Sequence, residues 1–445
     1  MTATTTVHAY RHPAELARSP DHRVTIDGIA CDVLRVPIHG GQVADVVIAG
    51  VAGSATIDVE CNGPATAAIV RPLHLGLSAQ CADARIRVQA TSPLHAVIER
   101  RGAPPLFLLL APPPAAPPAD AIRLAAGKIH DLGTYEVPAG RTLWIEGGAV
   151  LRGAVRARGP GVAVRGHGII DGSAFSSKNG RRRTLVLDRA HHGVVEGVTI
   201  INPSSWSCVL GGCDGARVSG LRVFGDVVCS DGVDLVGCRN TVVEDCLLCT
   251  NDDCVAIKAL DVSGHPGSTA PETDVSWARD ISTIEIRRCV LLNGPAGSGT
   301  MIGGETCCDS ICGISWRDLD ILCVHGHGSP FGILANDRAV IANIRYQDIR
   351  VEHHWDRLVD MRIVWNQEYS RDAERGQIRD VTFEDIRVAK LACNYGHTVA
   401  VIGGYDSKHT VEGVRFIDFI LDGKHVGSAG EMQLFTRDAT DIVFQ

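Results

Sequence analysis

The chain is poor in aromatic residues and in clustered positive charge. Phe, Trp and Tyr make up 5% of its 445 residues, and the formal net charge at pH 7 is −8. Proteins that bind nucleic acids or anionic membranes usually carry a basic patch or stripe. The run Arg181-Arg-Arg183 is the one local exception, and we interpret it as a solvated loop rather than a docking site for an acidic substrate. We therefore expect neither nucleic acid nor membrane as a partner.

Long apolar segments and a leader sequence are also missing. No stretch approaches the roughly 20 apolar residues that a membrane-spanning helix needs. The first residues, MTATTTVHAYRHPAEL, lack the basic-then-apolar pattern of a secretory signal. The expectation from these two absences is a soluble, cytoplasmic protein.

Cysteine, in contrast, is abundant: the chain has 16, and eleven of them lie within residues 208–312. In a long chain without a signal sequence, reduced and buried cysteines are a better interpretation than disulfides. Zinc binding by Cys246 and Cys249 is disfavoured, because residues three apart on a strand face opposite sides of the sheet. A second candidate group lies at 307–312. A stack of core cysteines explains the pattern better, and we expect no metal and no cofactor.

Glycine, valine and isoleucine are plentiful, which favours short strands joined by tight turns. Within residues 1–118, alternating segments such as HRVTIDGIACDVLRVPI and SATIDVEC predict a small N-terminal β-sandwich domain. A proline-rich stretch, APPPAAPPADA, begins at Ala111 and cannot continue a central strand. We place the domain boundary there, with a second domain over residues 119–445.

The second domain repeats itself. An alternating strand with a small or acidic residue at its centre recurs at spacings of 23 to 43 residues, which is typical of a solenoid whose coils carry inserted loops. The central residues are Gly197, Gly220, Asp245, Arg288, Asp318, Asp348, Asp385 and Asp418. Leucine-rich repeats share this period, but their signature and helical segments are missing. The pattern therefore predicts an all-β fold, a parallel β-helix.

Two acidic segments stand about one coil apart, since Asp231 and Asp252 are separated by 21 residues. Adjacent coils would place their backbones about 4.8 Å apart. Together with Asp253, three carboxylates would then repel one another and raise at least one pKa. Glycosidic bond hydrolysis uses such a set, with one protonated acid for the leaving oxygen and one carboxylate to activate water. Lys258 either points outward near the acid or lies in solvent.

Four segments resemble, in order and spacing, the signature of the polygalacturonase family, glycoside hydrolase family 28. They are Arg165-Gly-His-Gly-Ile-Ile-Asp-Gly172, Asn202-Pro-Ser-Ser-Trp206, Ser230-Asp-Gly-Val-Asp234 and Asn251-Asp-Asp-Cys-Val-Ala-Ile-Lys258. The resemblance spans roughly residues 125 to 390 and implies a right-handed parallel β-helix and a reaction that inverts anomeric configuration. It also implies that Asp252 is the general acid and that Asp231 and Asp253 hold and activate the water.

Two departures from the family pattern bear on the substrate. At Gly297-Ser298-Gly299 a serine stands where polygalacturonases have a histidine, and Gly332-Ile-Leu-Ala-Asn336 replaces the Arg-Ile-Lys that grips the galacturonate carboxylate. Arg362 lies a coil too late to take that role. A neutral sugar is therefore expected. The N-terminal sandwich is similar to the dextranase and isopullulanase family, glycoside hydrolase family 49, which implies α-linked neutral glucans.

Other polar and aromatic residues are candidates for substrate binding. They are Lys258, Trp206, Asp234, Glu305, Ser298 and Arg362. Trp206 and Trp277 either stack on a sugar ring or cover the core, and Asp234 either lines the site or caps a turn. His265 and Glu272 lie in a long insertion where a loop could overhang the cleft.

Two other functions remain open. One is a polysaccharide lyase or epimerase acting on a uronic-acid polymer, with calcium held by the three aspartates and Lys258 or Arg362 as the base. The other is a non-catalytic, carbohydrate-binding β-helix. The missing cationic clamp argues against the first and the aspartates against the second. The C-terminal strand Asp441-Ile-Val-Phe-Gln has no obvious capping helix, so self-association into a homo-oligomer through an exposed edge is a further hypothesis.

Overall fold

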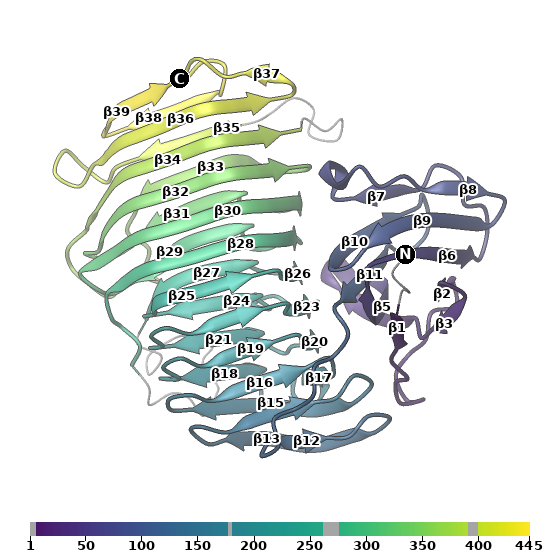
Figure 1. Ribbon diagram of the computed structural model, residues 1–445. Helices are drawn as coiled ribbons and strands as arrows, with labels where there is room; N and C mark the ends of the chain where they lie inside the picture. The colour runs from purple at the N-terminus through teal and green to yellow at the C-terminus, as the bar shows by residue number, and fades with distance from the viewer. Residues whose placement is uncertain (1–5, 177–179, 261–275, 390–398) are drawn as a thin grey trace.

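The computed structural model describes four stretches of the chain: residues 6–176, 180–260, 276–389 and 399–445. Within them the chain forms strands and three short 3-10 helices, and none of their helices has the length and apolarity needed to span a membrane. Figure 1 shows a small sandwich lying beside a tall stack of coils. The predicted all-β class is confirmed. His265 and Glu272 lie outside the described residues.

Two sheets form the sandwich. One has the strand order β1-β5-β11-β10-β7 with β4 beside β5, and the other has the order β3-β2-β6-β9-β8. Pairing is antiparallel except between β5 and β11, which run parallel. The strands are β1 Thr6–Ala9, β2 His22–Ile26, β3 Ile29–Cys31, β4 Leu34–Ile38, β5 Gln42–Ala52, β6 Ser54–Cys61, β7 Ile69–Arg71, β8 Gln80–Ala82, β9 Arg85–Thr91, β10 Leu94–Glu99 and β11 Leu106–Ala111.

Strand β11 attaches the sandwich to the coils. All six of its residues are buried, and alternate ones point into the sandwich core. Phe107 and Leu109 point the other way, into a cluster shared with the coils, where the ring centroids of Phe107 and Phe224 lie 5.1 Å apart. A strand buried on both faces loses the usual alternation of apolar and polar residues, so the run Leu-Phe-Leu-Leu-Leu follows from this docking.

The remaining strands form one sheet that winds into a right-handed parallel β-helix (Figure 1), as predicted. Each strand pairs with the equivalent strand of the next coil, and in later coils two strands merge into one long strand. The strands are β12 Ile122–Leu124, β13 Ile129–Val137, β14 Thr142–Ile145, β15 Val150–Arg158, β16 Ala163–Gly166, β17 Ile169–Asp171, β18 Leu185–Asp188, β19 Val194–Glu196, β20 Thr199–Ile201, β21 Cys208–Gly211, β22 Arg217–Ser219, β23 Arg222–Phe224, β24 Val233–Val236, β25 Arg239–Glu244, β26 Leu247–Thr250, β27 Val255–Ala259, β28 Ile281–Asn293, β29 Thr300–Thr306, β30 Ser310–Val324, β31 Phe331–Ala335, β32 Val340–Val351, β33 Arg357–Ile363, β34 Gln377–Val388, β35 Val399–Gly403, β36 Val411–Leu421, β37 Lys424–His425, β38 Leu434–Arg437 and β39 Ala439–Phe444.

The eight central residues of the sequence repeat share one backbone conformation. Their φ angles all lie between 49° and 75°, in the left-handed region that glycine and aspartate adopt with least strain. Gly197, for example, separates β19 from β20. The repeat therefore marks one corner of each coil. This corner separates two strands in the earlier coils and lies within one long strand in the later ones, as Asp318 does in β30.

The cysteines lie where the sequence predicts. The 15 described cysteines are free, and seven of them are buried in the core of the coils. These are Cys208, Cys213, Cys238, Cys246, Cys254, Cys289 and Cys308. Cys249 instead faces the sandwich, so Cys246 and Cys249 do point to opposite sides of their strand.

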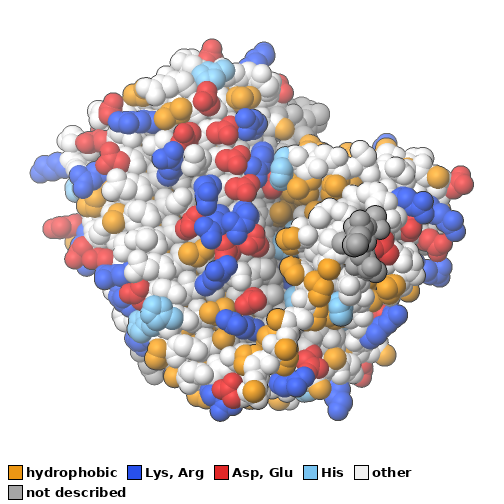
Figure 2. Space-filling model, in the orientation of Figure 1, with side chains coloured by type: hydrophobic (Ala, Val, Ile, Leu, Met, Phe, Trp, Pro, Cys, Tyr) orange, Lys and Arg blue, Asp and Glu red, His pale blue; other side chains and the backbone are white. Residues whose placement is uncertain are grey.

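Charged side chains run in rows along the coils beside the sandwich, with acids and bases intermixed (Figure 2). Arg350 contacts Asp318 at 2.7 Å, Asp320 at 2.8 Å and Asp348 at 2.8 Å. Asp318 and Asp348, two central residues of the sequence repeat, thus form a ladder of ion pairs across adjacent coils. We refer to these four residues as the Arg350 ladder.

The C-terminal end of the helix has a cap that the sequence does not reveal. Val426 and Met432, from the segment between β36 and β38, are buried and belong to the core of the coils. Ile442 and Phe444 of β39 pack against the same core. Self-association stays a prediction, as does the division into two domains at residue 118.

Candidate active site

The three aspartates expected to carry catalysis, here called the acid trio, meet at one corner of two adjacent coils. Asp231 lies just before β24, and Asp252 and Asp253 lie just before β27. These strands are neighbours, with Val233 opposite Val255. One carboxylate oxygen from each aspartate lies within 4.8 Å of the other two. The 21-residue spacing therefore does bring the three carboxylates together.

The next coil holds Asp253 in place. The backbone N–H of Ser298 donates to Asp253 Oδ1 at 2.7 Å. Gly297 has a φ of +71°, and a Cβ there would lie 2.2 Å from the nitrogen of Asp253, so glycine is required for this close approach. Ser298 is 1% exposed, and its Oγ accepts from the N–H of Ser329 at 3.2 Å. Ser298, expected to bind substrate, thus acts on Asp253 through its backbone.

Asp252 is held by two backbone donors. The N–H of Cys229 donates to Asp252 Oδ2, and the N–H of Asp253 donates to Oδ1, both at 3.0 Å. Cys229 has a φ of +68°, an uncommon conformation for a residue with a side chain. Asn293 Nδ2 donates to the carbonyl of Asp252 at 2.6 Å. Neither Cys229 nor Asn293 is identified by the sequence, because their contacts cross coils and belong to no motif.

Lys258 bridges two buried acids. Its Nζ lies 2.8 Å from Asp231 Oδ2 and 2.9 Å from Asp234 Oδ1, and none of the three residues is more than 5% exposed. Lys258 lies opposite Val236 in the sheet ladder, on the outer face of the sheet. The alternative of a solvated lysine is wrong, and Asp234 takes part in this ion pair rather than capping a turn.

Neither tryptophan offers an open face to a sugar. The ring centroid of Trp206 lies 4.1 Å from Lys258 Nζ and 4.5 Å from the guanidinium carbon of Arg183, and the residue is 6% exposed. Contact of this kind stabilises a buried cation. Trp277 is fully buried, and its Nε1 donates to Asp188 at 2.9 Å. Both rings therefore have a covering role, packed with other buried residues on the sheet, and do not stack on a sugar.

The run Arg181–Arg183 borders the site, which contradicts its interpretation as a solvated loop. Arg183 is 4% exposed because it packs on Trp206, and the guanidinium of Arg182 lies 5.3 Å from the ring centroid of Phe175. Burial and the charge of Asp252 raise the pKa of the Cys229 thiol, and the charge of Arg181 opposes that rise. Arg181 therefore lies near Cys229, whose N–H donates to Asp252.

Glu305 and Tyr369 extend the site along the sheet. Glu305 is buried on β29, and its charge adds to those of the acids around Lys258. The ring of Tyr369 lies 3.6 Å from where a Cβ on Gly304 would be. Burial, with smaller contributions from Glu368 and Glu305, raises the pKa of Tyr369 to about 12. Its hydroxyl is a half-buried donor that the sequence motifs do not mark.

Burial and mutual repulsion change the proton affinity of these groups. Burial, followed by the charge of Asp231, raises the pKa of Asp252 to about 6. Burial also raises the pKa of Asp253, with the charges of Asp252 and Asp231 adding to it. Burial alone would lower the pKa of Lys258, but Asp231 and Asp234 hold it well above its usual value. The site therefore keeps a permanent ammonium and favours protonation of a neighbouring acid.

Arg362 lies away from the acid trio. It is on β33, three ladder steps from β27, or about 14 Å. Its guanidinium contacts both carboxylate oxygens of Asp360, at 2.5 and 2.8 Å. With Trp365, Tyr405 and Phe435 it lines a groove of about 690 Å³. Only a substrate that extends along the sheet from the trio could reach it.

Comparison with known proteins gives short sequence matches. No protein-family model matches the chain. It is 29% identical to a polygalacturonase from Juniperus ashei over 90 residues and 26% identical to one from Chamaecyparis obtusa over 91 residues. Each alignment covers 20% of this chain and 18% of the relative. The chain therefore matches less than a fifth of the length of these relatives.

Solved structures match over much more of the chain. Dex49A from Penicillium minioluteum matches over 97% of this chain and 96% of its own, with a TM-score of 0.65 and 12% identity. An exopolygalacturonase from Thermotoga maritima covers 72% of this chain and 83% of its own, with a TM-score of 0.54 and 15% identity. At such identities the likeness establishes the fold. The resemblance to polygalacturonase-like glycoside hydrolases, with dextranase-like relatives, is confirmed.

Proposed function

We propose that this protein is a glycoside hydrolase that cleaves O-glycosidic bonds of a poly- or oligosaccharide. The observation that carries the proposal is that neighbouring carboxylates in one site have different surroundings. One is paired with a cation, and another has a raised pKa. Lys258 neutralises Asp231, whereas burial and repulsion raise the pKa of Asp252 to about 6. A protonated acid beside an ionised one is the combination that glycosidic hydrolysis requires.

In this mechanism Asp252 donates its proton to the leaving glycosidic oxygen. Its two backbone donors, Cys229 and Asp253, fix the carboxyl plane. Asp231, which is paired with Lys258, and Asp253 hold a water and accept its proton as it attacks. Asp234 and Trp206 position the Lys258 ammonium.

The stereochemical outcome proposed is inversion, which rests on the polygalacturonase resemblance. Carboxyl groups are generally about 6.5–9.5 Å apart in inverting enzymes and about 5–5.5 Å apart in retaining ones. The 4.8 Å limit within the trio joins one oxygen of each carboxylate and is a different quantity from the separation of the carboxyl groups. Proton NMR of the first product formed distinguishes the two outcomes, and an initial anomer that retains the substrate configuration would refute inversion.

We further propose a neutral, α-glucan-like substrate. A uronic acid needs a cation free to bind its carboxylate, but Lys258 is engaged by two aspartates and Arg362 by Asp360. The coverage of both the sandwich and the coils by Dex49A agrees with a dextranase-like substrate. The proximity of Arg181 favours a second candidate, an acidic galacturonan. An Arg181→Gln variant that loses activity on polygalacturonate and not on dextran would identify that second candidate as correct.

A calcium-dependent lyase is supported less well by the same geometry. A calcium ion held by the acid trio would face the Lys258 ammonium, which already contacts Asp231 at 2.8 Å. Lys258 is also a poor general base, because its raised pKa keeps it protonated at neutral pH. An unsaturated product that absorbs in the ultraviolet and forms only with calcium would favour the lyase.

The test is the release of reducing sugar from dextran, other neutral α-glucans, galactans and polygalacturonate. Wild type and Asp252→Asn are compared, each with and without chelator. Release from one polymer that the variant loses and the chelator leaves unchanged supports the proposal. If no polymer releases reducing sugar, or if the chelator abolishes the activity, the proposal is contradicted.

A further inference from the structure

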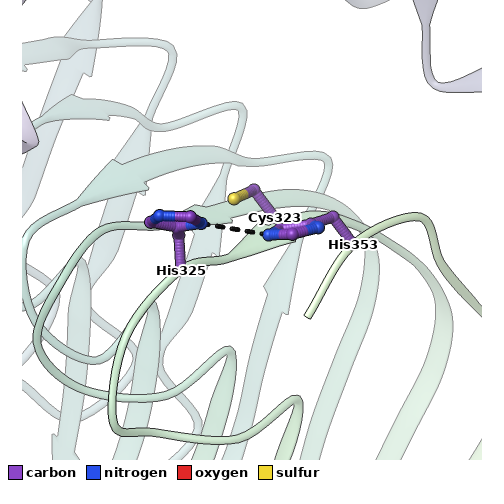
Figure 3. A group of neighbouring side chains, drawn as sticks. All are labelled: Cys323, His325 and His353. Carbon is purple, nitrogen blue, oxygen red and sulfur yellow. Dashed lines mark hydrogen bonds between the residues drawn. The ribbon is translucent and has the colours of Figure 1, made fainter. Parts of the chain in front are cut away.

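Two histidines and a cysteine that are not part of the acid trio meet on the coils. Cys323 lies near the end of β30 and His325 just after it, and His353 follows β32 on the next coil. One atom of each side chain lies within 4.8 Å of the other two. Figure 3 shows the three side chains converging, with His325 Nδ1 and His353 Nε2 joined at 3.0 Å.

The donor set suits a borderline or soft metal ion. Zinc binds imidazole nitrogen at about 2.0–2.1 Å and thiolate sulfur at about 2.3 Å, so tetrahedral ligand atoms lie roughly 3.3–3.6 Å apart. The 3.0 Å between the two histidine nitrogens needs only a small widening to admit an ion. Thiolate and imidazole together select Zn²⁺, Co²⁺ or copper over Mg²⁺ and Ca²⁺, which prefer oxygen.

The surroundings of the cluster also fit an ion. His353 is buried, Cys323 half-buried and His325 exposed, so an ion could enter from the side of His325. Glu352, which directly precedes His353, is paired with Arg71 of the sandwich.

We propose that Cys323, His325 and His353 form a transition-metal site of the Zn²⁺ class that joins two consecutive coils. The three ligands leave one coordination position for water or a further side chain. His39 reaches the same coil from the sandwich, since its Cβ lies 2.3 Å from where a Cβ on Gly294 would be. The site lies where the sandwich meets the coils.

The site is connected to the acid trio through the backbone. The N–H of His325 donates to the carbonyl of Asn293 at 3.2 Å, and Asn293 Nδ2 donates to the carbonyl of Asp252 at 2.6 Å. An ion here would restrain the coil edge that carries Asp252 without touching a reacting group. Its effect would be on stability, because a ligand that binds only the folded state raises the free energy of unfolding.

The experiment is a Co²⁺ titration of the reduced, metal-free full-length chain. We expect a thiolate-to-cobalt charge-transfer band in the near ultraviolet that saturates at one equivalent and disappears when Zn²⁺ is added. Thermal unfolding should shift to higher temperature with Zn²⁺ at saturation. Neither readout depends on glycosidase activity, so the proposed metal site is tested independently of the proposed function.

Variants identify the ligands. Cys323→Ser should abolish the band, and His325→Ala, a change at an exposed residue, should weaken Co²⁺ binding at least about tenfold. Cys312→Ser is the matched control, because Cys312 is a half-buried cysteine of the same strand, and it should leave the band unchanged. A band that survives Cys323→Ser, or no band in the wild type, would overturn the proposal.

Discussion

Two groups of aspartates lie across neighbouring coils of this helix, the Arg350 ladder and the acid trio. They differ in their ion pairing and in their exposure to water. In the Arg350 ladder each aspartate has its own guanidinium nitrogen, at 2.7 to 2.8 Å. Two of the ladder's aspartates, Asp318 and Asp348, are also 42% and 45% exposed. Each ladder aspartate therefore has a direct contact with a cation, and two of the three also have water, so we interpret the ladder as a structural feature.

In the acid trio Asp231 and Asp253 are buried and Asp252 is half-buried, and within the described residues Asp231 alone of the three forms an ion pair. Lys258 contacts Asp231, and its second contact is to Asp234 rather than to another member of the trio. Asp252 and Asp253 accept backbone N–H groups instead, which hold the carboxylates without neutralising them. Clustering of acids is therefore common to both groups, and what distinguishes the trio is uncompensated charge in a site with little water.

The largest difference between the two groups should appear in turnover. Replacing Asp252 with Asn removes the proton donor, and general acid catalysis is typically worth roughly 10²–10⁴-fold. Asp348→Asn, the matched change in the Arg350 ladder, should leave turnover unchanged. Reducing-sugar release measures both. If Asp252→Asn keeps more than about a tenth of wild-type activity, Asp252 is not the general acid.

The next largest difference should be in stability. Lys258→Met leaves Asp231 and Asp234 buried without their cation, and breaking a buried pair costs about 3–5 kcal/mol. Arg350→Met should cost less, because two of its partners are partly exposed and such pairs contribute about 0–1 kcal/mol each. Urea unfolding at neutral pH compares the two variants. If both variants lose the same free energy of unfolding, the ion pairs of the trio and of the ladder contribute equally to stability and the distinction between them fails.

A smaller effect is expected in the pH dependence of stability. The folded-state pKa of Asp252, about 6, lies above its unfolded value of about 4. The stability that its protonation supplies is therefore present below about pH 4 and is lost as the pH rises towards 6. Asp252→Asn removes this loss. The Tm of the variant relative to that of the wild type should therefore rise by about 1–3 °C between pH 4 and pH 7. A constant Tm difference across that range would argue against a raised pKa.

The smallest effect should come from the ladder itself. Asp348→Asn removes one largely exposed ion pair and should change the free energy of unfolding by less than about 1 kcal/mol. The same urea unfolding experiment applies. A loss comparable to that of Lys258→Met would mean that the ladder aspartates are more tightly coupled than their exposure indicates.

The architecture was predictable because each coil obeys the same local rule. One corner needs a residue that tolerates positive φ, which leaves Gly197, Asp245 and their equivalents at regular positions. The pattern cannot say that these residues form the corner itself, since the flanking residues alternate on both sides of it. The C-terminal cap was missed for a related reason, because Val426 and Met432 lie in an irregular loop with no periodicity.

The site was predictable as far as its motifs extend. The spacing of Asp231 and Asp252 follows from the length of one coil, and this alone brings the carboxylates together. The donors from Cys229 and Ser298 are backbone groups, which any residue type could supply, so no side-chain pattern marks them. Trp206 shows a second limit, because the cations that cover its ring, Arg183 and Lys258, come from other coils.

The central claim is that burial and the charge of Asp231 raise the pKa of Asp252 to about 6, so that it can hold a proton closer to neutral pH than an ordinary aspartate does. The most direct test is the carboxyl ¹³C chemical shift of labelled aspartates followed through a pH titration, with Asp252→Asn used to assign the resonance. A midpoint near 6 for Asp252 is the expected result. A midpoint near 4, the ordinary value for aspartate, would contradict the account and remove the general acid from the proposed mechanism.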